Sequence, residues 1–214
     1  MAYTISPLYP ILDASLLPLE DRSGFVTRLA GELLDAGVSL LQYRNKTGSD
    51  REVLEDVAML RHLLPAGRCV LILNDRPDLA VLGGFDGVHV GQQDLSPDAA
   101  RGIVGKGRVV GVSTHNAEQL RMAAEAPVDY IAIGPIFPTA SKQNPDPVVG
   151  LEGIRLARSL TSRPLVAIGG ITLENCSQVK EAGADSIAVI SSLFQSPSGE
   201  SPAKVARDFL ARFR

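Results

Sequence analysis

The sequence predicts a single-domain (β/α)8 TIM barrel over residues 1–214, and three observations support this fold class. Short β-rich runs alternate with amphipathic segments along the whole 214-residue chain. Most of the runs are continuously apolar, as expected for parallel strands that are covered on both faces. Eight units of about 27 residues fit a small barrel, because barrels begin near 200 residues. An open, doubly wound sheet is the alternative to this fold.

The eight predicted strands are short. They cover residues 9–12, 39–43, 70–73, 87–90, 109–112, 130–133, 165–168 and 186–190. Between them, apolar residues recur every three or four positions, which predicts helices that bury one face. The clearest of these helical patterns lie in residues 25–34, 53–64, 173–179 and 205–213.

Four residues are predicted to mark helix ends. Gly37 and Gly183 stand where a glycine commonly follows the last helical turn. Asn116 and Thr172 stand at the head of helical patterns and are predicted as N-caps.

Composition excludes several classes of protein. The longest apolar stretches are five or six residues, whereas a membrane-spanning helix needs about 20. A net charge of −3 with interspersed signs argues against nucleic acid or an anionic membrane as the main partner. The first ten residues lack the pattern of a secretory signal. Cys69 and Cys176 lie in apolar patterns, which predicts buried, reduced thiols in a cytoplasmic protein. Assembly into a homo-oligomer is left open.

Polar residues gather just after the predicted strands, where barrel enzymes carry their chemistry. Arg44 and Lys46 are two residues apart, and two such cations suit a polyanion such as a diphosphate. Asp75 and Asp94 follow neighbouring strands, and carboxylates beside a diphosphate suit Mg²⁺. Helix N-capping is the alternative role for each aspartate.

Later strand ends also carry candidate ligand sites. Gly169-Gly170 and Ser191-Ser192 follow the last two strands, where barrels commonly bind phosphate. Residues 134–150 form a long loop with four prolines, predicted to act as a lid rather than as a plain surface loop. Ser113 and His115 lie two residues apart without a G-x-S-x-G motif, which argues against a hydrolase triad.

Six strand-end segments, taken in order, resemble those of the thiamine-phosphate synthase family. They are Q-Y-R-N-K at 42–46, N-D-R at 74–76, G-V-H-V-G-Q-Q-D at 87–94, G-V-S-T-H at 111–115, G-P-I-F-P-T-A-S-K at 134–142 and A-I-G-G-I at 167–171. The resemblance implies a Mg²⁺-dependent transferase of thiamine biosynthesis. It would join hydroxymethylpyrimidine diphosphate to hydroxyethylthiazole phosphate by dissociative substitution and release pyrophosphate.

The resemblance also implies a role for each matching residue. Asp75 and Asp94 would hold Mg²⁺, and Arg44, Lys46, Ser113 and Lys142 would take part in catalysis. The residues that would bind the pyrimidine diphosphate are Gln42, Tyr43, Arg44, Asn45, Lys46, Asn74, Ser113 and Lys142. Those that would bind the thiazole phosphate are Thr139, Ala140, Ser141, Gly170, Ile190 and Ser191. Ser141 replaces the usual threonine of the family but keeps its hydroxyl.

Two other functions fit the same barrel. A thiazole tautomerase of the same superfamily would need a proton-transfer residue, for which His115 or His89 could serve. A non-catalytic sensor would bind one phosphate ligand without turnover. The synthase is favoured because the diphosphate and metal set is complete, with Arg44, Lys46, Asn74, Asp75, Asp94 and Lys142 all present.

Overall fold

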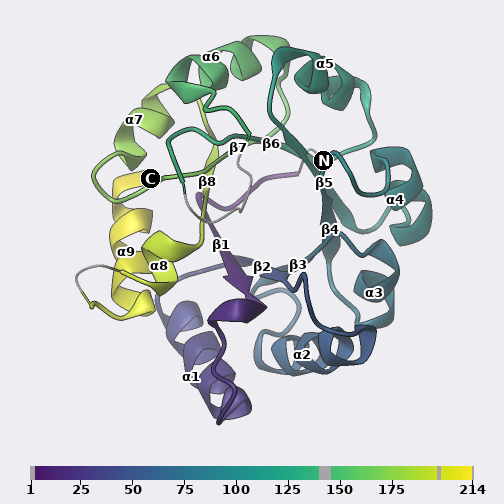
Figure 1. Ribbon diagram of the computed structural model, residues 1–214, viewed down its shortest axis with the longest axis vertical. Coiled ribbons are helices and arrows are strands. Elements are labelled where there is room, and N and C mark those ends of the chain that lie inside the picture. Colours follow the sequence, from purple (N-terminus) through teal and green to yellow (C-terminus); the bar gives the residue numbers. More distant parts are fainter. Residues whose placement is uncertain (1–2, 140–145, 197–198, 214) are drawn as a thin grey trace.

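The predicted barrel is confirmed by the computed structural model, which describes residues 3–139, 146–196 and 199–213. Within these residues, eight parallel strands pair in chain order and the last closes on the first (Figure 1). They are β1 (Leu8–Asp13), β2 (Leu40–Arg44), β3 (Val70–Asn74), β4 (Gly87–Val90), β5 (Val109–Thr114), β6 (Tyr130–Ile133), β7 (Leu165–Ile168) and β8 (Ser186–Val189). Each overlaps one predicted run.

Helices form a ring outside the strands (Figure 1). They are α1 (Arg22–Asp35), α2 (Asp50–Leu63), α3 (Pro77–Leu82), α4 (Pro97–Val104), α5 (Ala117–Glu125), α6 (Gly150–Leu160), α7 (Cys176–Glu181), α8 (Ser191–Phe194) and α9 (Pro202–Phe213), with a short 3₁₀ turn η1 (Ala14–Leu16). None of the described helices is long and apolar enough to cross a membrane.

Two apolar layers lie on opposite sides of the strands, because successive strand residues face opposite ways. The outer layer packs the strands against the helices and includes Leu12, Leu41 and Phe209. The inner layer fills the barrel and includes Ile11 and Ile72, together with the residues Ile5, Tyr9, Leu40, Tyr130, Ala132, Val166 and Ala188. Burial on both faces accounts for the continuous apolar runs of the sequence.

The segment before β1 lies across the amino-terminal end of the barrel (Figure 1). Ile5 belongs to the inner layer, and the ring of Tyr3 lies 6.4 Å from that of Tyr130. The opposite end, where the strands finish, carries the polar loops that the sequence singled out.

Three of the four predicted helix ends are confirmed. Gly37 and Gly183 follow α1 and α7 with φ of +88° and +110°, and the Asn116 side chain accepts the Gln119 N–H at 3.0 Å. The prediction for Thr172 is wrong, because α7 begins only at Cys176. Residues 172–175 form a turn in which the Asn175 side chain accepts the Thr172 N–H at 2.8 Å.

Both cysteines are buried and unpaired, as predicted. Burial raises the pKa of the Cys69 thiol to about 12, so this side chain is protonated at neutral pH.

Candidate active site

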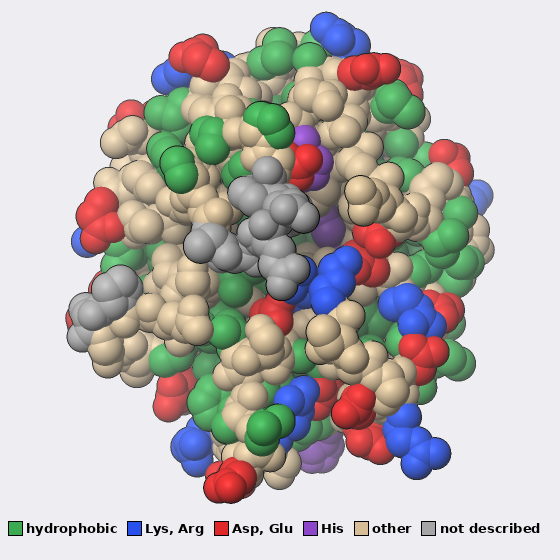
Figure 2. Space-filling view, in the orientation of Figure 1, with side chains coloured by type: hydrophobic (Ala, Val, Ile, Leu, Met, Phe, Trp, Pro, Cys, Tyr) green, Lys and Arg blue, Asp and Glu red, His purple; other side chains and the backbone are tan. Residues whose placement is uncertain are grey.

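A cavity of about 1570 Å³ opens at the carboxyl ends of the strands. Basic, acidic and histidine side chains gather near the centre of this face (Figure 2). A single small ligand usually occupies about 300–1,000 Å³, so the cavity has room for two side by side. The predicted residues that line it are Gln42, Arg44, Asn45, Lys46, Asn74, Asp75, Asp94, Ser113, Thr139, Gly170, Ile190 and Ser191.

The remaining predicted residues fall into two groups. Ala140, Ser141 and Lys142, with the centre of the predicted lid, lie outside the described residues. Tyr43 is fully buried on the outer side of the sheet, where its hydroxyl donates to Asp56 of α2. The Tyr43 side chain therefore faces the helices, because it is one position out of phase with its neighbours Gln42 and Arg44.

Both basic side chains of the β2 end pair with carboxylates. Arg44 forms an ion pair with Asp13 at the end of β1, and Lys46 forms one with Asp75 after β3. Burial disfavours the charged form of Asp13, but hydrogen bonds from Ser15 and Arg44 outweigh it and hold the pKa of Asp13 below its usual range. The two cations are therefore held toward the cavity by fixed negative partners.

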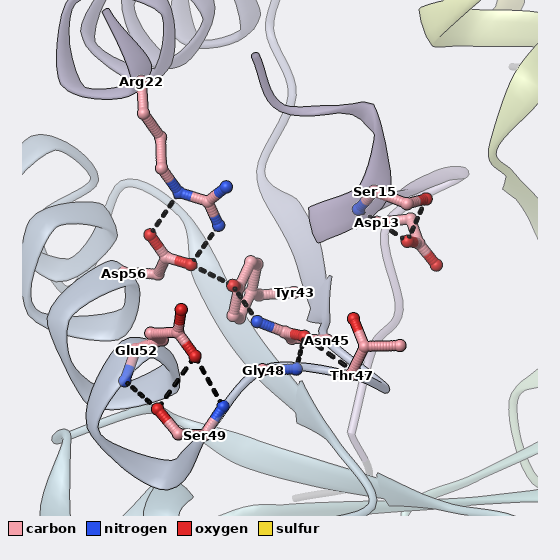
Figure 3. A network of polar contacts seen from close by, with 10 residues as sticks. All are labelled: Asp13, Ser15, Arg22, Tyr43, Asn45, Thr47, Gly48, Ser49, Glu52 and Asp56. Carbon is pink, nitrogen blue, oxygen red and sulfur yellow. Dashed lines mark hydrogen bonds and ion pairs between the residues drawn. The ribbon is translucent and has the colours of Figure 1, made fainter. Parts of the chain in front are cut away.

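Hydrogen bonds of Asn45 and Tyr43 stabilise the loop that carries Lys46 (Figure 3). Asn45 donates to the Tyr43 oxygen at 3.2 Å, and its carbonyl accepts the N–H groups of Thr47 at 3.2 Å and Gly48 at 2.8 Å. Asp56, which accepts from Tyr43, is also paired with Arg22 of α1 at 2.5 Å. The Tyr43 side chain thus supports this loop from the helix side of the sheet.

Asp75 and Asp94 lie together at the ends of β3 and β4. Burial raises the pKa of the Asp75 carboxyl, and the neighbouring Asp94 raises it further, against the opposite effect of Lys46. Neither aspartate caps a helix, since the N-caps of α3 and α4 are Arg76 and Ser96. The capping alternative is therefore wrong for both.

The chemistry of these two carboxylates fits a divalent cation. Two neighbouring carboxylates that disfavour each other's charge gain from a cation placed between them. Mg²⁺ is commonly held by one or two carboxylates, with water and substrate phosphates completing its shell. Among the residues that the structure describes, no group of three or more His, Cys, Asp or Glu side chains forms a fuller metal site.

The two glycines after β7 allow a close approach of two loops. Gly169 and Gly170 have φ of +100° and +64°, which favour glycine. A Cβ at Gly170 would lie 2.5 Å from the Pro138 carbonyl oxygen, and one at Gly169 would lie 2.6 Å from Cβ of Pro135. The loop after β6 is therefore packed directly on the loop after β7, and Ser191 at the start of α8 lines the same cavity.

Sequence reasoning missed a chain of buried polar groups beneath the cavity. It runs from Gln42 through Tyr9, Tyr130 and His89 to Ser113, with successive distances of 2.9, 2.8, 2.9 and 2.8 Å. Tyr9 and Tyr130 stand at the start of apolar runs, where the pattern predicts core residues. A polar group at an inward position of an otherwise apolar strand is the signal that could have found the chain.

His115 also faces the cavity but is engaged by the loop after β6. Its Nδ1 lies 2.6 Å from the Gly134 carbonyl oxygen, so Nδ1 carries a hydrogen and donates it. Its Nε2 lies 3.4 Å from Asp146.

Comparison with known proteins shows the family of this chain. A family model described as thiamine monophosphate synthase matches residues 8–193. A thiamine-phosphate synthase of Koribacter versatilis (strain Ellin345) is 58% identical over 190 residues, which cover 89% of this chain and 90% of that protein. One from Synechococcus sp. (strain WH7803) is 42% identical over 83% of this chain and 49% of its own, longer sequence.

A solved structure is similar over nearly its whole length. Thiamine phosphate pyrophosphorylase from Pyrococcus furiosus superposes with a TM-score of 0.82 at 30% identity, covering 96% of this chain and 94% of that one. The family model spans the barrel from β1 into α8, which includes every strand end that lines the cavity. The chain therefore belongs to the thiamine monophosphate synthase family.

Proposed function

We propose that this protein is a thiamine-phosphate synthase, a transferase that joins hydroxymethylpyrimidine diphosphate to hydroxyethylthiazole phosphate and releases pyrophosphate. One observation carries this proposal. A single cavity has two cations and two carboxylates at the ends of β2, β3 and β4, and a glycine-serine surface at the ends of β7 and β8. The first group suits a diphosphate with Mg²⁺, and the second lies where barrels commonly bind a single phosphate.

The pyrimidine diphosphate is assigned to the β2–β5 side of the cavity. Arg44 and Lys46 bind its phosphates, with Asn45 and Asn74 nearby, while Gln42 and Ser113 meet the pyrimidine ring. Lys142 is assigned to the diphosphate from the sequence resemblance. Tyr43 supports this side through Asp56 and Asn45.

Mg²⁺ is assigned to Asp75 and Asp94, whose donor chemistry fits it. When bound, Mg²⁺ neutralises part of the charge that builds up on the departing diphosphate. Asp94 is held in place by the Gly91 N–H, which donates to its carboxylate at 2.8 Å.

The thiazole phosphate is assigned to the β7–β8 side. Gly170, Ile190 and Ser191 offer backbone N–H groups and a hydroxyl there, and Thr139 approaches from the loop after β6. Ala140 and Ser141 are assigned to the same phosphate from the sequence resemblance.

The residues suit a dissociative substitution. The bond between the pyrimidine methylene and the diphosphate oxygen breaks first, and the thiazole nitrogen then attacks the resulting cation. Arg44 and Lys46 stabilise the negative charge that leaves, and their pairing with Asp13 and Asp75 fixes them before the reaction begins. Anchoring the thiazole phosphate across the cavity holds the thiazole nitrogen in line for attack. No protein nucleophile is required.

The tautomerase alternative is disfavoured by the polar groups of the cavity. That reaction concerns only the thiazole phosphate, so it leaves Arg44, Lys46, Asp75 and Asp94 without a role. We place the enzyme in the cytoplasm, supported by its two buried, unpaired cysteines.

The test is a product assay with purified protein, Mg²⁺ and the two substrates, supplied singly and together. We expect thiamine phosphate and pyrophosphate in equal amounts, and only when both substrates are present. Conversion of a thiazole phosphate tautomer alone would favour the tautomerase. Binding of one ligand with no product from the pair would favour the sensor.

A further inference from the structure

Five polar side chains from five strands cross the inside of the barrel below the cavity. They form the hydrogen-bonded chain Gln42–Tyr9–Tyr130–His89–Ser113, and each step is 2.8–2.9 Å. The two ends of the chain and the residues Tyr9 and His89 line the cavity. Tyr130, in the middle, is fully buried and does not line it.

The chain has one direction. The Gln42 Nε2 group only donates, so the Tyr9 oxygen accepts from it. Among the residues that the structure describes, the Tyr9 hydroxyl has one other hydrogen-bond partner, the Tyr130 hydroxyl. Tyr9 must therefore donate to Tyr130. Burial raises the pKa of both Tyr9 and Tyr130, so each keeps the hydrogen that this relay requires.

The same direction of donation determines the tautomer of His89. Having accepted from Tyr9, Tyr130 donates to Nδ1 of His89, which therefore carries no hydrogen. The imidazole hydrogen lies on Nε2 and is donated to the Ser113 oxygen. The hydrogen of the Ser113 hydroxyl is then directed away from His89.

We propose that this chain sets the hydrogen-bonding pattern of the cavity floor, and that Tyr130 and His89 are positioning residues for the pyrimidine ring. Ser113 is held as a donor to the ligand. Gln42, whose amide nitrogen is turned to Tyr9, presents its carbonyl oxygen as an acceptor. The inference rests on the function proposed above.

An aminopyrimidine matches this pattern. Its ring nitrogens accept hydrogen bonds, and its exocyclic amino group donates them. One donor and one acceptor, held at the two ends of the hydrogen-bonded chain, therefore select both the ring and its orientation. The diphosphate makes no use of this pattern, because its oxygens only accept and they are assigned to Arg44, Lys46 and the metal.

The decisive variant is Tyr130→Phe, which removes one oxygen from a residue that does not touch the ligand. With Mg²⁺ present, the affinity for hydroxymethylpyrimidine diphosphate should fall roughly fivefold to tenfold, the scale of one hydrogen bond. The affinity for inorganic pyrophosphate, which lacks the ring, should stay unchanged. Calorimetry on the whole protein measures both, and steady-state kinetics should show the loss as a higher KM for the pyrimidine substrate alone.

A second variant tests the direction of the chain. In His89→Gln the amide can accept from Tyr130 and donate to Ser113, so pyrimidine binding should stay close to that of the wild type. In His89→Leu neither bond forms, and the pyrimidine affinity should fall at least as far as in Tyr130→Phe. If Tyr130→Phe does not fold, the comparison of His89→Gln with His89→Leu still tests the inference.

The matched control is Thr114→Val, which removes a buried hydroxyl one residue after Ser113. Thr114 donates to the Ala132 carbonyl at 2.8 Å and does not line the cavity. We expect unchanged affinity for both ligands.

Three results would overturn the inference. The first is an equal loss of affinity for pyrophosphate and pyrimidine diphosphate in Tyr130→Phe, and the second is unchanged binding of both ligands in that variant. The third is a loss in Thr114→Val as large as in Tyr130→Phe. If the wild type itself binds pyrimidine diphosphate no better than pyrophosphate, the proposed function fails, and the inference with it.

Discussion

At the scale of single residues, the cavity contains charges that are already paired. Arg44 is held by Asp13, and Lys46 is held by Asp75. Pairing fixes the direction of each cation through a charge-assisted hydrogen bond. Burial and the neighbouring Asp94 both raise the pKa of the Asp75 carboxyl, while Lys46 acts in the opposite direction.

The carboxylate pair yields a prediction for Asp94→Asn. The amide oxygen can still accept the Gly91 N–H, while one negative charge beside Asp75 is lost. Without metal, the melting temperature should stay the same or rise, because repulsion and desolvation of the pair are relieved. Turnover should fall about 100-fold or more, the scale seen when one charge-stabilising group is removed. Stabilisation by Mg²⁺ with pyrophosphate in thermal melts should disappear.

Asp98→Asn is the matched control for this change. Asp98 is exposed in the first turn of α4 and does not line the cavity. The Asp98→Asn protein should lose little stability, and it should keep both its turnover and its stabilisation by Mg²⁺ with pyrophosphate. Near wild-type turnover of Asp94→Asn at saturating substrate would show that Asp94 is no metal ligand.

At the scale of elements, glycines decide how the cavity loops pack. In Gly170→Val the new Cβ would meet the Pro138 carbonyl oxygen, and a β-branched residue would be strained at φ +64°. The loop that carries Thr139 must then move, so we expect the affinity for the thiazole phosphate to fall at least about tenfold. Calorimetry with that ligand alone measures the loss.

Gly84→Ala separates backbone strain from loop displacement. Gly84 has a similar φ of +68°, lies at the opposite end of the barrel before β4, and leaves open space for a Cβ. It should lose stability but keep thiazole phosphate binding. If both variants lost binding equally, displacement of the loop after β6 would not be the cause.

A repeated contact holds the amino-terminal end of the barrel together. Asp86, Asp129 and Asp185 precede β4, β6 and β8, and each accepts the N–H of a residue on the preceding strand at 2.7–2.8 Å. Each also forms an ion pair with an arginine on the helix that comes before that preceding strand. These arginines are Arg61 on α2, Arg101 on α4 and Arg158 on α6. The recurrence of an aspartate before these strands in the sequence is thus explained by a repeated strand-to-helix connection.

This repeated contact predicts a purely structural effect for Asp129→Ala. The Val110 N–H and one N–H of Arg101 would lose their acceptor, at a cost of about 1–3 kcal/mol. For a chain of this size that lowers the melting temperature by about 2–4 °C per kcal/mol. Turnover per folded molecule should be unchanged, because the contact lies at the end opposite the cavity. Exposed Glu118→Ala on α5 serves as the reference; a large fall in kcat for Asp129→Ala alone would contradict this division.

The elements themselves were largely predictable from the sequence. Buried parallel strands leave continuous apolar runs, and these runs located all eight strands. The position of a polar residue after such a run also predicted that it would reach the cavity. The local pattern does not determine which face of the sheet Tyr43 takes, because that depends on the phase of β2. It also does not determine the role of Thr172, because that depends on where α7 begins. The Tyr9–Tyr130–His89 chain depends on closure of the barrel, which brings β1, β4 and β6 together inside it.

At the scale of the whole molecule, the two ends of the barrel are used differently. The amino-terminal end carries the repeated aspartate–arginine contacts and is covered by the segment around Ile5. The carboxyl end carries the large cavity and the charged side chains that line it. This is the division expected of barrel enzymes, with stability at one end and chemistry at the other.

The central claim is that one cavity holds two anionic ligands apart, with a divalent cation on the diphosphate side. A crystal structure with Mn²⁺, pyrophosphate and thiamine phosphate tests it most directly. We expect an anomalous signal from Mn²⁺ at about 2.0–2.2 Å from oxygens of both Asp75 and Asp94, the scale of such metal–oxygen bonds. Pyrophosphate should contact Arg44 and Lys46, and the phosphate of the product should contact Gly170 and Ser191. A metal bound elsewhere, or both phosphate groups on the same side of the cavity, would contradict the account.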